Sequence, residues 1–414
     1  KLIPIEVSKE EQVEIVEDAP EGLPWKIEES IWAGRPKETD SRDFWDGEKA
    51  YEKGFAVEWG KLAGKEKFMN FLDREGKKYK SKLSTEELVT AVSEIIKTNW
   101  AFISRVYRYY SSLSSTKNSG MPLNDWTELL NSANIPDNDS AHCKVSDCDT
   151  IFITANYMAT KEKDVDENAL GRYQFIEALA RLSTAKYPTT PDEALKKLFK
   201  DNLLALLPPE ATFDSNVFRS ERFYNEEIDV LLTSKKRVLE ALYSRYRLPP
   251  RSGERRHKAM LITDFLVFAS DCDLYSGHFT ERTTRMCYAY AKPTASDEFG
   301  NLLKFMEMSF MDFTEALGHM ADMIDFPTKE ELSLNGYHNI LEYHQVVRID
   351  PNLAIDIRES AHFRSPKTRP LDEKLEMLLD FIFRKLDYSD HPGYSYSDSQ
   401  FIKKLGQIDK SLGP

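Results

Sequence analysis

Oxygen-bearing side chains recur at alternate positions in one short stretch of the chain. Ser114, Thr116 and Asn118 stand there, and Asp125 follows seven residues after the last of them. Numbered from Ser114, the four occupy positions 1, 3, 5 and 12, which is the ligand spacing of a calcium-binding loop. A single carboxylate, however, offsets little of the cost of dehydrating a divalent cation. The stretch therefore has the spacing of a calcium site with only part of its charge.

The residues that end this stretch belong to a ten-residue motif that occurs four times. In each unit an apolar residue is followed five positions later by an aromatic one, and an acid or a glutamine precedes the aromatic. The units are MPLNDWTELL (121–130), LGRYQFIEAL (170–179), MLITDFLVFA (260–269) and MSFMDFTEAL (308–317). The first and third units begin 139 residues apart, the second and fourth 138, and Tyr107 and Tyr246 repeat the longer offset. This constancy predicts a duplicated segment with two units in each copy.

Helical periodicity flanks these units. Apolar residues recur at helical spacing from Leu88 to Val106, and again through the second unit up to Pro188. Helix, loop, short β segment and helix is the plan of the EF-hand, and the chain resembles the EF-hand superfamily over about half of its length. The resemblance implies an all-α fold with two EF-hand-like helix–loop–helix pairs, in which Met121 pairs with Leu170, and Met260 with Met308.

The chain is accordingly divided into five predicted parts. They are a Trp-rich N-terminal extension (1–84), an EF-hand-like pair 1 (85–190), a helical connector (191–229), an EF-hand-like pair 2 (230–328) and a C-terminal helical extension (329–414). The N-terminal extension is consistent either with an extended strap over the folded body or with a small helical cap. In the C-terminal extension, DEKLEMLLDFIFRKLD (372–387) has an apolar stripe that favours a core helix over a partner site.

The ligand positions of the other three loops are poorer than those of the first. The second loop begins with Lys163, the third offers Arg255 and His257, and the fourth offers Leu303 and Phe305. A shifted register of the second loop, from Asp166 through Asn168 to Glu177, places a glycine where the loop turns but loses the apolar match. We expect no bound metal, and calcium is the one cofactor left open. Its candidate ligands are Ser114, Thr116, Asn118, Asp125, Asp166, Asn168 and Glu177.

Catalytic motifs are not evident. The chain has no Gly-rich phosphate loop, no HExxH and no GxSxG. His142, Cys143 and Cys148 lie close together, but no second ligand pair at a zinc spacing accompanies them. His319 follows apolar neighbours on a predicted helix, which is typical of a core histidine. These observations predict a protein that is not an enzyme.

One segment is basic in an otherwise acidic chain. SRYRLPPRSGERRHK (244–258) falls in the third loop and carries six cations against one acid. It is either a solvated loop or a docking site for an acidic partner, since guanidinium groups bind carboxylates in pairs of hydrogen bonds. The candidate partner-binding residues are Arg245, Arg247, Arg251, Arg255, Arg256 and Lys258.

Composition limits the setting in which the protein works. The net charge of −13 disfavours binding to nucleic acid or to anionic membranes, and no run of apolar residues is long enough for a transmembrane helix. Four cysteines among 414 residues favour a reducing cytoplasmic compartment. An aromatic residue followed by EAL is similar to the tubulin polymerisation-promoting family and to divergent ciliary EF-hand proteins. We therefore expect a scaffold or interaction protein of the cilium, flagellum or cytoskeleton, with tubulin or an axonemal component as a partner. A calcium sensor with divergent loops is the alternative.

Overall fold

Helices make up most of the structure. The computed structural model describes residues 24–114, 120–157, 168–247, 259–276, 279–298, 300–301, 306–324, 326–350, 369–387 and 398–408. Within these residues, strand structure is limited to one two-stranded ladder and one isolated bridge. The all-α prediction is confirmed. No helix in the described part of the chain is both long and apolar enough to cross a membrane.

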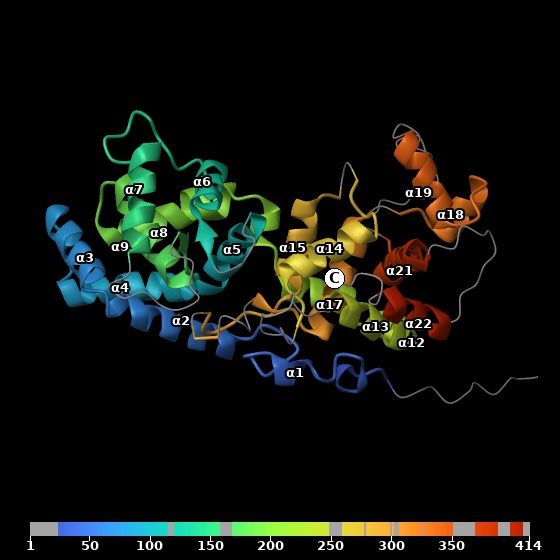
Figure 1. Ribbon diagram of the computed structural model, residues 1–414. Coiled ribbons are helices and arrows are strands. Elements are labelled where there is room, and N and C mark those ends of the chain that lie inside the picture. Colours follow the sequence, from blue (N-terminus) through green and yellow to red (C-terminus); the bar gives the residue numbers. More distant parts are fainter. Residues whose placement is uncertain are drawn as a thin grey trace, which may run out of the picture.

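Two segments of the chain contain matching series of elements (Figure 1). The first copy consists of α4 (Thr85–Thr98), α5 (Trp100–Leu113), β1 (Met121–Pro122), α6 (Leu123–Ser132), α7 (Val145–Asn156), β2 (Ala169–Leu170) and α8 (Arg172–Lys186). The second copy consists of α12 (Glu226–Ser234), α13 (Lys236–Tyr246), α14 (Ile262–Asp271), α15 (Glu281–Ala291) and α17 (Phe310–Met323). The start predicted for the second pair, residue 230, lies inside α12.

The short β contacts lie where the motif predicts them. Met121 pairs with Leu170 in the antiparallel ladder of β1 and β2. Met260 and Met308 form the corresponding bridge and exchange backbone hydrogen bonds of 3.1 and 2.7 Å. Both predicted pairings are confirmed. Gly120 precedes the first ladder, and a Cβ there would stand 2.8 Å from the Leu170 carbonyl oxygen, so the ladder requires glycine at this position.

Three aromatic rings pack in the same arrangement in both copies, beside the ladder in the first and beside the bridge in the second. Trp126 meets Phe175 edge to face at 6.2 Å between ring centroids, and Phe265 meets Phe313 in the same way at 6.3 Å. In the first copy Tyr107 donates to the Leu170 carbonyl at 3.0 Å. In the second copy the residue that donates to the Met308 carbonyl is Tyr243, at 2.7 Å. The sequence match of Tyr107 with Tyr246 is therefore wrong.

The equivalent helices α6 and α14 end in the same kind of turn. Asn134 after α6 and Asp273 after α14 both have positive φ, 49° and 55°. The next residue closes each turn, with Ile135 N–H donating to Leu130 O and Leu274 N–H to Ala269 O. This is the left-handed helix end in which asparagine is tolerated and aspartate occurs less often. Because the two turns are 139 residues apart, backbone conformation repeats along with sequence.

The N-terminal extension combines the two forms that the sequence left open. Residues 24–47 run along the second copy without regular structure, except for the 3₁₀ turn Ile27–Glu29 and the short helix α1 (Arg35–Glu38). They are followed by two helices, α2 (Glu48–Ala63) and α3 (Glu66–Lys78), which pack on the first copy. In Figure 1 this blue segment lies along one side of both copies.

The connector is helical but irregular. It runs through α9 (Pro191–Lys197), the π-helix Leu198–Leu203 and α10 (Leu204–Leu206), then through the 3₁₀ helix Pro209–Thr212, α11 (Ser215–Phe218) and the π-helix Arg219–Phe223. The helical connector expected from the sequence is thus interrupted by the wider turn of a π-helix. This turn lets Asn202 donate to the Ala133 carbonyl at 2.8 Å, which ties the connector to the first copy.

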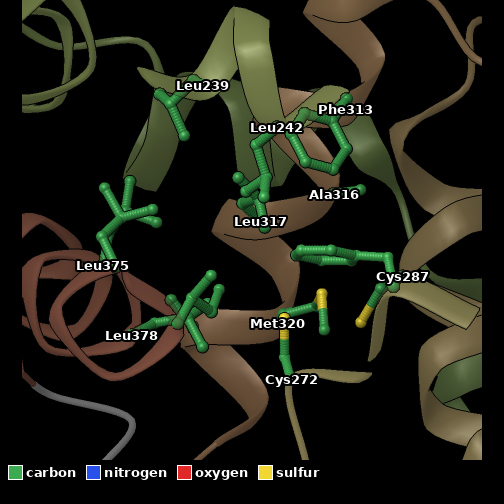
Figure 2. Close-up of a cluster of buried hydrophobic side chains, with 14 of the residues drawn as sticks. Leu239, Leu242, Cys272, Cys287, Phe313, Ala316, Leu317, Met320, Leu375 and Leu378 are labelled. Carbon is green, nitrogen blue, oxygen red and sulfur yellow. The ribbon is translucent and has the colours of Figure 1, made fainter. Parts of the chain in front are cut away.

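The C-terminal extension covers the second copy. Its helices are α18 (Lys329–Leu334), α19 (Ile340–Ile349), α21 (Leu371–Asp387) and α22 (Asp398–Ile408). α21 packs on α12 and α17, where α9 packs on the equivalent α4 and α8 of the first copy. Figure 2 shows Leu375 and Leu378 of α21 directed toward Leu317 and Leu242, and all four are buried. The apolar stripe is therefore core, as predicted.

Candidate functional site: the ends of the paired loops

The last-ligand position of each predicted loop, which holds Asp125, Gln174, Asp264 or Asp312, lies in the first turn of the helix that follows. Three of these side chains cap that helix. The Gly171 N–H donates to Gln174 Oε1 at 2.7 Å, the Leu261 N–H to Asp264 Oδ2 at 2.9 Å, and the Ser309 N–H to Asp312 Oδ2 at 3.0 Å. A carboxylate or amide in this position satisfies a backbone N–H that the helix leaves unpaired. Three of the four side chains thus accept a hydrogen bond from the backbone N–H three residues before them.

The first loop is closed differently. Pro122 precedes α6 and has no N–H to donate, so Asp125 cannot cap the helix in the same way. Instead Asp125 Oδ1 accepts a hydrogen bond of 2.7 Å from the hydroxyl of Ser114, which joins the first and last predicted ligands directly. Asp125 is buried, and its Oδ2 has no hydrogen-bond partner among the described residues. Burial raises the pKa of this carboxyl, and the Ser114 hydrogen bond opposes the shift.

In the fourth loop a cation does meet the last-ligand carboxylate, and the chain itself supplies it. The guanidinium of Arg35, from α1, lies 3.0 Å from Asp312 Oδ1 and 3.0 Å from Glu315 Oε2. It also donates to the Ala291 carbonyl at 3.2 Å. Arg219, from the second π-helix, contacts Glu315 Oε1 at 2.9 Å. Four buried charges therefore lie at the end of this loop and pair with one another.

The first copy holds the equivalent glutamate in the same manner. Glu177 stands 138 residues before Glu315, three positions after Gln174, and is also buried. Lys65, just before α3, lies 2.5 Å from Glu177 Oε2, and Arg181 lies 2.8 Å from Oε1. In both copies the N-terminal extension supplies one of the two cations. We call these contacts the Arg35 cluster and the Lys65 cluster.

Electrostatics show how firmly Glu315 is held in its charged form. Burial by itself raises the pKa of a carboxyl, because it removes water from the anion. The adjacent guanidinium groups of Arg219 and Arg35 outweigh burial and lower the pKa of Glu315 to about 2. His319, one turn further along α17, is buried between Phe213 and Phe218, and burial lowers its pKa. It is a core histidine.

Several predicted site residues lie outside the described part of the chain. These are Thr116, Asn118 and Asp166 among the calcium candidates, and Arg251, Arg255, Arg256 and Lys258 among the basic residues. Asn168 is described and exposed, one residue before β2. Glu177, the remaining calcium candidate, is engaged by Lys65 and Arg181. Among the described residues no group of three or more His, Cys, Asp or Glu side chains is arranged to hold a metal ion.

The two described arginines of the basic segment lie on aromatic rings of their own helix. The Arg245 guanidinium is 5.4 Å from the ring centroid of Tyr246, and that of Arg247 is 5.6 Å from the ring of Tyr243. Cation–π contacts of this kind anchor the charged groups against α13. Arg247 stays exposed and Arg245 is half-buried.

Sequence reasoning missed the cations that close the loops. Arg35 is 277 residues from Asp312, and no local pattern links such distant positions. The glutamates of the two clusters could have been found from the sequence. Glu177 and Glu315 both occur in the EAL of their units, on a helix face that the apolar periodicity predicts to be buried. A buried glutamate that stays charged needs a cationic partner.

Comparison of the chain with known proteins found no matching family model, no matching curated protein and no matching solved structure.

Proposed function

We propose that the protein is a non-enzymatic scaffold or interaction protein built on two degenerate EF-hand-like pairs. The proposal rests on the Arg35 cluster, because the guanidinium of Arg35 forms an ion pair with the carboxylate that a calcium ion would need as a ligand. An arginine is charged at any physiological pH and is joined to the chain. Loops closed in this way hold one shape at every calcium concentration, which suits a constant binding platform.

The covered faces of both copies support the same proposal. Calcium sensors of the EF-hand type open to expose an apolar groove that binds a target helix. Here α9 lies on α4 and α8, and α21 lies on α12 and α17. Leu375, Leu378 and Ile382 of α21 are completely buried. The chain's own helices thus take the place of a target helix.

A calcium sensor is the second candidate, and one observation favours it. Asp125 Oδ2 is a buried carboxylate oxygen without a hydrogen-bond partner in the described part of the chain, and it stands at the last-ligand position of the loop with the most oxygen ligands. Such an atom is a suitable calcium ligand. Its one described neighbour among the predicted ligands, Ser114, is neutral.

The ciliary or cytoskeletal setting, the cytoplasmic location and a tubulin or axonemal partner rest on the sequence resemblance. They are proposed on the basis of that resemblance. The six basic residues from Arg245 to Lys258 are its proposed contact with an acidic partner.

Amide hydrogen exchange with and without calcium separates the two candidates. A scaffold keeps α9, which covers the first copy, equally protected in calcium and in chelator, because no loop changes state. A sensor that binds calcium at Asp125 releases the groove of the first copy, so the amides of α9 lose protection when calcium is added. Calcium-dependent exchange in α9 would replace the scaffold proposal with the sensor.

A further inference from the structure

The end of α3 carries a cluster of exposed cations. Between residues 73 and 82 the chain has five cations against two carboxylates, in a protein whose net charge is −13. We call this cluster the basic patch; its residues, all exposed, are Arg74, Lys77, Lys78, Lys80 and Lys82. It is distinct from the basic segment of the third loop.

The charges of the basic patch are only partly used within the chain. Arg74 and Lys78 contact Glu75, and Lys77 contacts Asp73, with the cationic side chains 50 to 75% exposed. Exposed pairs of this kind contribute little to stability and exchange readily for other partners. Within the described residues, Lys80 and Lys82 form no ion pair. The patch therefore offers positive charge to an outside group.

The position of Lys80 is not explained by the stability of α3. Cations in the last turn of a helix favour its C-terminal dipole, which accounts for Lys77 and Lys78. Lys80 lies beyond the helix with a positive φ of 54°, where Ser81 N–H closes the turn on the Gly76 carbonyl. Glycine is the preferred residue in this conformation. The turn favours glycine at this position, so the stability of the fold does not explain the positive charge of the lysine.

A hollow of about 270 Å³ opens beside the basic patch, between α3, α7 and α8. Arg74, Lys78 and His142 line it together with the apolar side chains of Phe71 and Ile151. Its acids are already satisfied, since Glu75 accepts from Arg74 and Lys78, and Asp147 accepts from the Lys144 N–H at 2.9 Å. The hollow can take one side chain of a bound segment, with its charged end near the cations.

We propose that the basic patch and this hollow bind an acidic, extended peptide segment of a partner protein. A short acidic segment contacts the patch alone. A nucleic acid or an anionic bilayer would extend beyond it and meet the acidic remainder of the molecule. A single hollow also suits a side chain better than a flat bilayer surface. The proposal names a partner class for the proposed scaffold, but it depends neither on the paired loops nor on calcium.

The test uses the full chain and a fluorescent oligoglutamate peptide, followed by anisotropy. We expect saturable binding that weakens by about tenfold or more between roughly 50 and 300 mM salt, because exposed charges are screened over this range. Reversing Lys77, Lys80 and Lys82 to Glu should weaken binding by a further factor of about ten or more. Lys80→Gly should weaken it less and should raise the midpoint of urea unfolding, which shows that the fold is intact.

A matched control separates the patch from the net charge. Lys26, Lys49 and Lys53 are exposed and lie on the N-terminal extension away from α3, and their reversal to Glu changes the net charge equally. The control should bind the peptide within about threefold of the parent chain, since distant exposed charges are screened.

Equal loss in the control and the patch variant would overturn the proposal, as would no binding by the parent chain. Patch-dependent binding to phosphatidylserine vesicles without binding to the peptide would also overturn it, in favour of a membrane contact. None of these results alters the calcium response of α9, so failure here is distinguishable from failure of the proposed function.

Discussion

At the residue scale, a cation of the chain itself pairs with the last-ligand residue of the fourth predicted loop, since Arg35 contacts Asp312. A calcium ion can dissociate, whereas Arg35 is part of the chain. Its guanidinium group contacts Asp312, Glu315 and the Ala291 carbonyl. Burial of the Arg35 guanidinium costs free energy, because the charge loses its water. The ion pairs offset this cost only while both partners remain. Removal of one partner leaves the other charge buried and uncompensated.

Arg35→Met should therefore destabilise the protein strongly. We expect a loss of about 3–5 kcal/mol in the free energy of unfolding, since Asp312 and Glu315 lose a common partner. Urea unfolding measures it. Lys37→Met on the same short helix is the control: Lys37 is exposed, so its change should stay within about 0.5 kcal/mol. Similar losses in both variants would show that the Arg35 cluster is not special.

A second buried cluster should make stability depend on pH. Arg172 contacts both Glu58 and Glu298, and lies 2.6 Å from Glu298 Oε1. Burial raises the pKa of Glu298 to about 7, although Arg172 opposes the shift. Because the folded state then holds a proton that the unfolded state releases above about pH 4.5, stability should fall as pH rises from about 4.5 to 7.

Glu298→Gln should remove this loss. Glutamine keeps an oxygen for Arg172 and cannot ionise, so the variant should be more stable than the parent at pH 8 and similar at pH 4.5. Urea midpoints across this pH range measure the difference. A variant that follows the parent at every pH would mean that Glu298 ionises normally. Glu315 works in the opposite direction: its lowered pKa predicts that stability is lost as pH falls from about 4.5 toward 2.

At the element scale, each pair of loops is joined by a β contact that tolerates little change. The ladder of Met121 and Leu170 brings two backbones together beside Gly120. A methyl group at Gly120 would meet both the Leu170 carbonyl oxygen and the Ala169 side chain at less than 3.0 Å. The ladder would have to open or shift to make room.

Gly120→Ala should destabilise the protein by about 1–3 kcal/mol, which is the usual cost of overpacking. Gly60→Ala is the matched control, because Gly60 lies inside α2 with no atom within 4 Å of the position of an added Cβ. Alanine there should stabilise the helix by about 0.5–1 kcal/mol. Thermal unfolding of the two variants should move in opposite directions. Movement in the same direction would mean that the ladder does not constrain Gly120.

The elements also show what the sequence could and could not predict. The β pairings were predictable because the motif fixes a register at both ends of each pair. The match of Tyr107 with Tyr246 failed because the loop after α13 is longer than the one after α5, so the tyrosine that reaches the ladder is Tyr243. The cations of the two clusters were not predictable, since Lys65 and Arg35 meet their glutamates only through the tertiary fold.

At the scale of the whole molecule, the extensions complete the two copies. The N-terminal extension reaches both, through Lys65 and Arg35, and α21 covers the second copy as α9 covers the first. The copies also meet directly, since Arg108 of α5 donates to the Lys292 carbonyl at 2.7 Å. The described parts of both extensions therefore belong to the folded core.

Leu378→Ala should show that α21 is part of this core. Leu378 is completely buried against the second copy, and truncation should cost about 2–5 kcal/mol. Leu334→Ala on α18 is the control, because Leu334 is 77% exposed and its truncation should cost less than about 0.5 kcal/mol. Urea unfolding distinguishes them. A neutral Leu378→Ala would show that α21 is not needed for the fold.

Calorimetric titration of calcium into the full chain tests most directly whether the chain's own groups close the loops. We expect no saturable heat, and an unfolding midpoint that is the same in about 1 mM calcium and in chelator. A site with micromolar affinity would instead stabilise the fold by about 4 kcal/mol at that concentration. Saturable binding with that increase in stability would show that a loop of the chain still holds calcium.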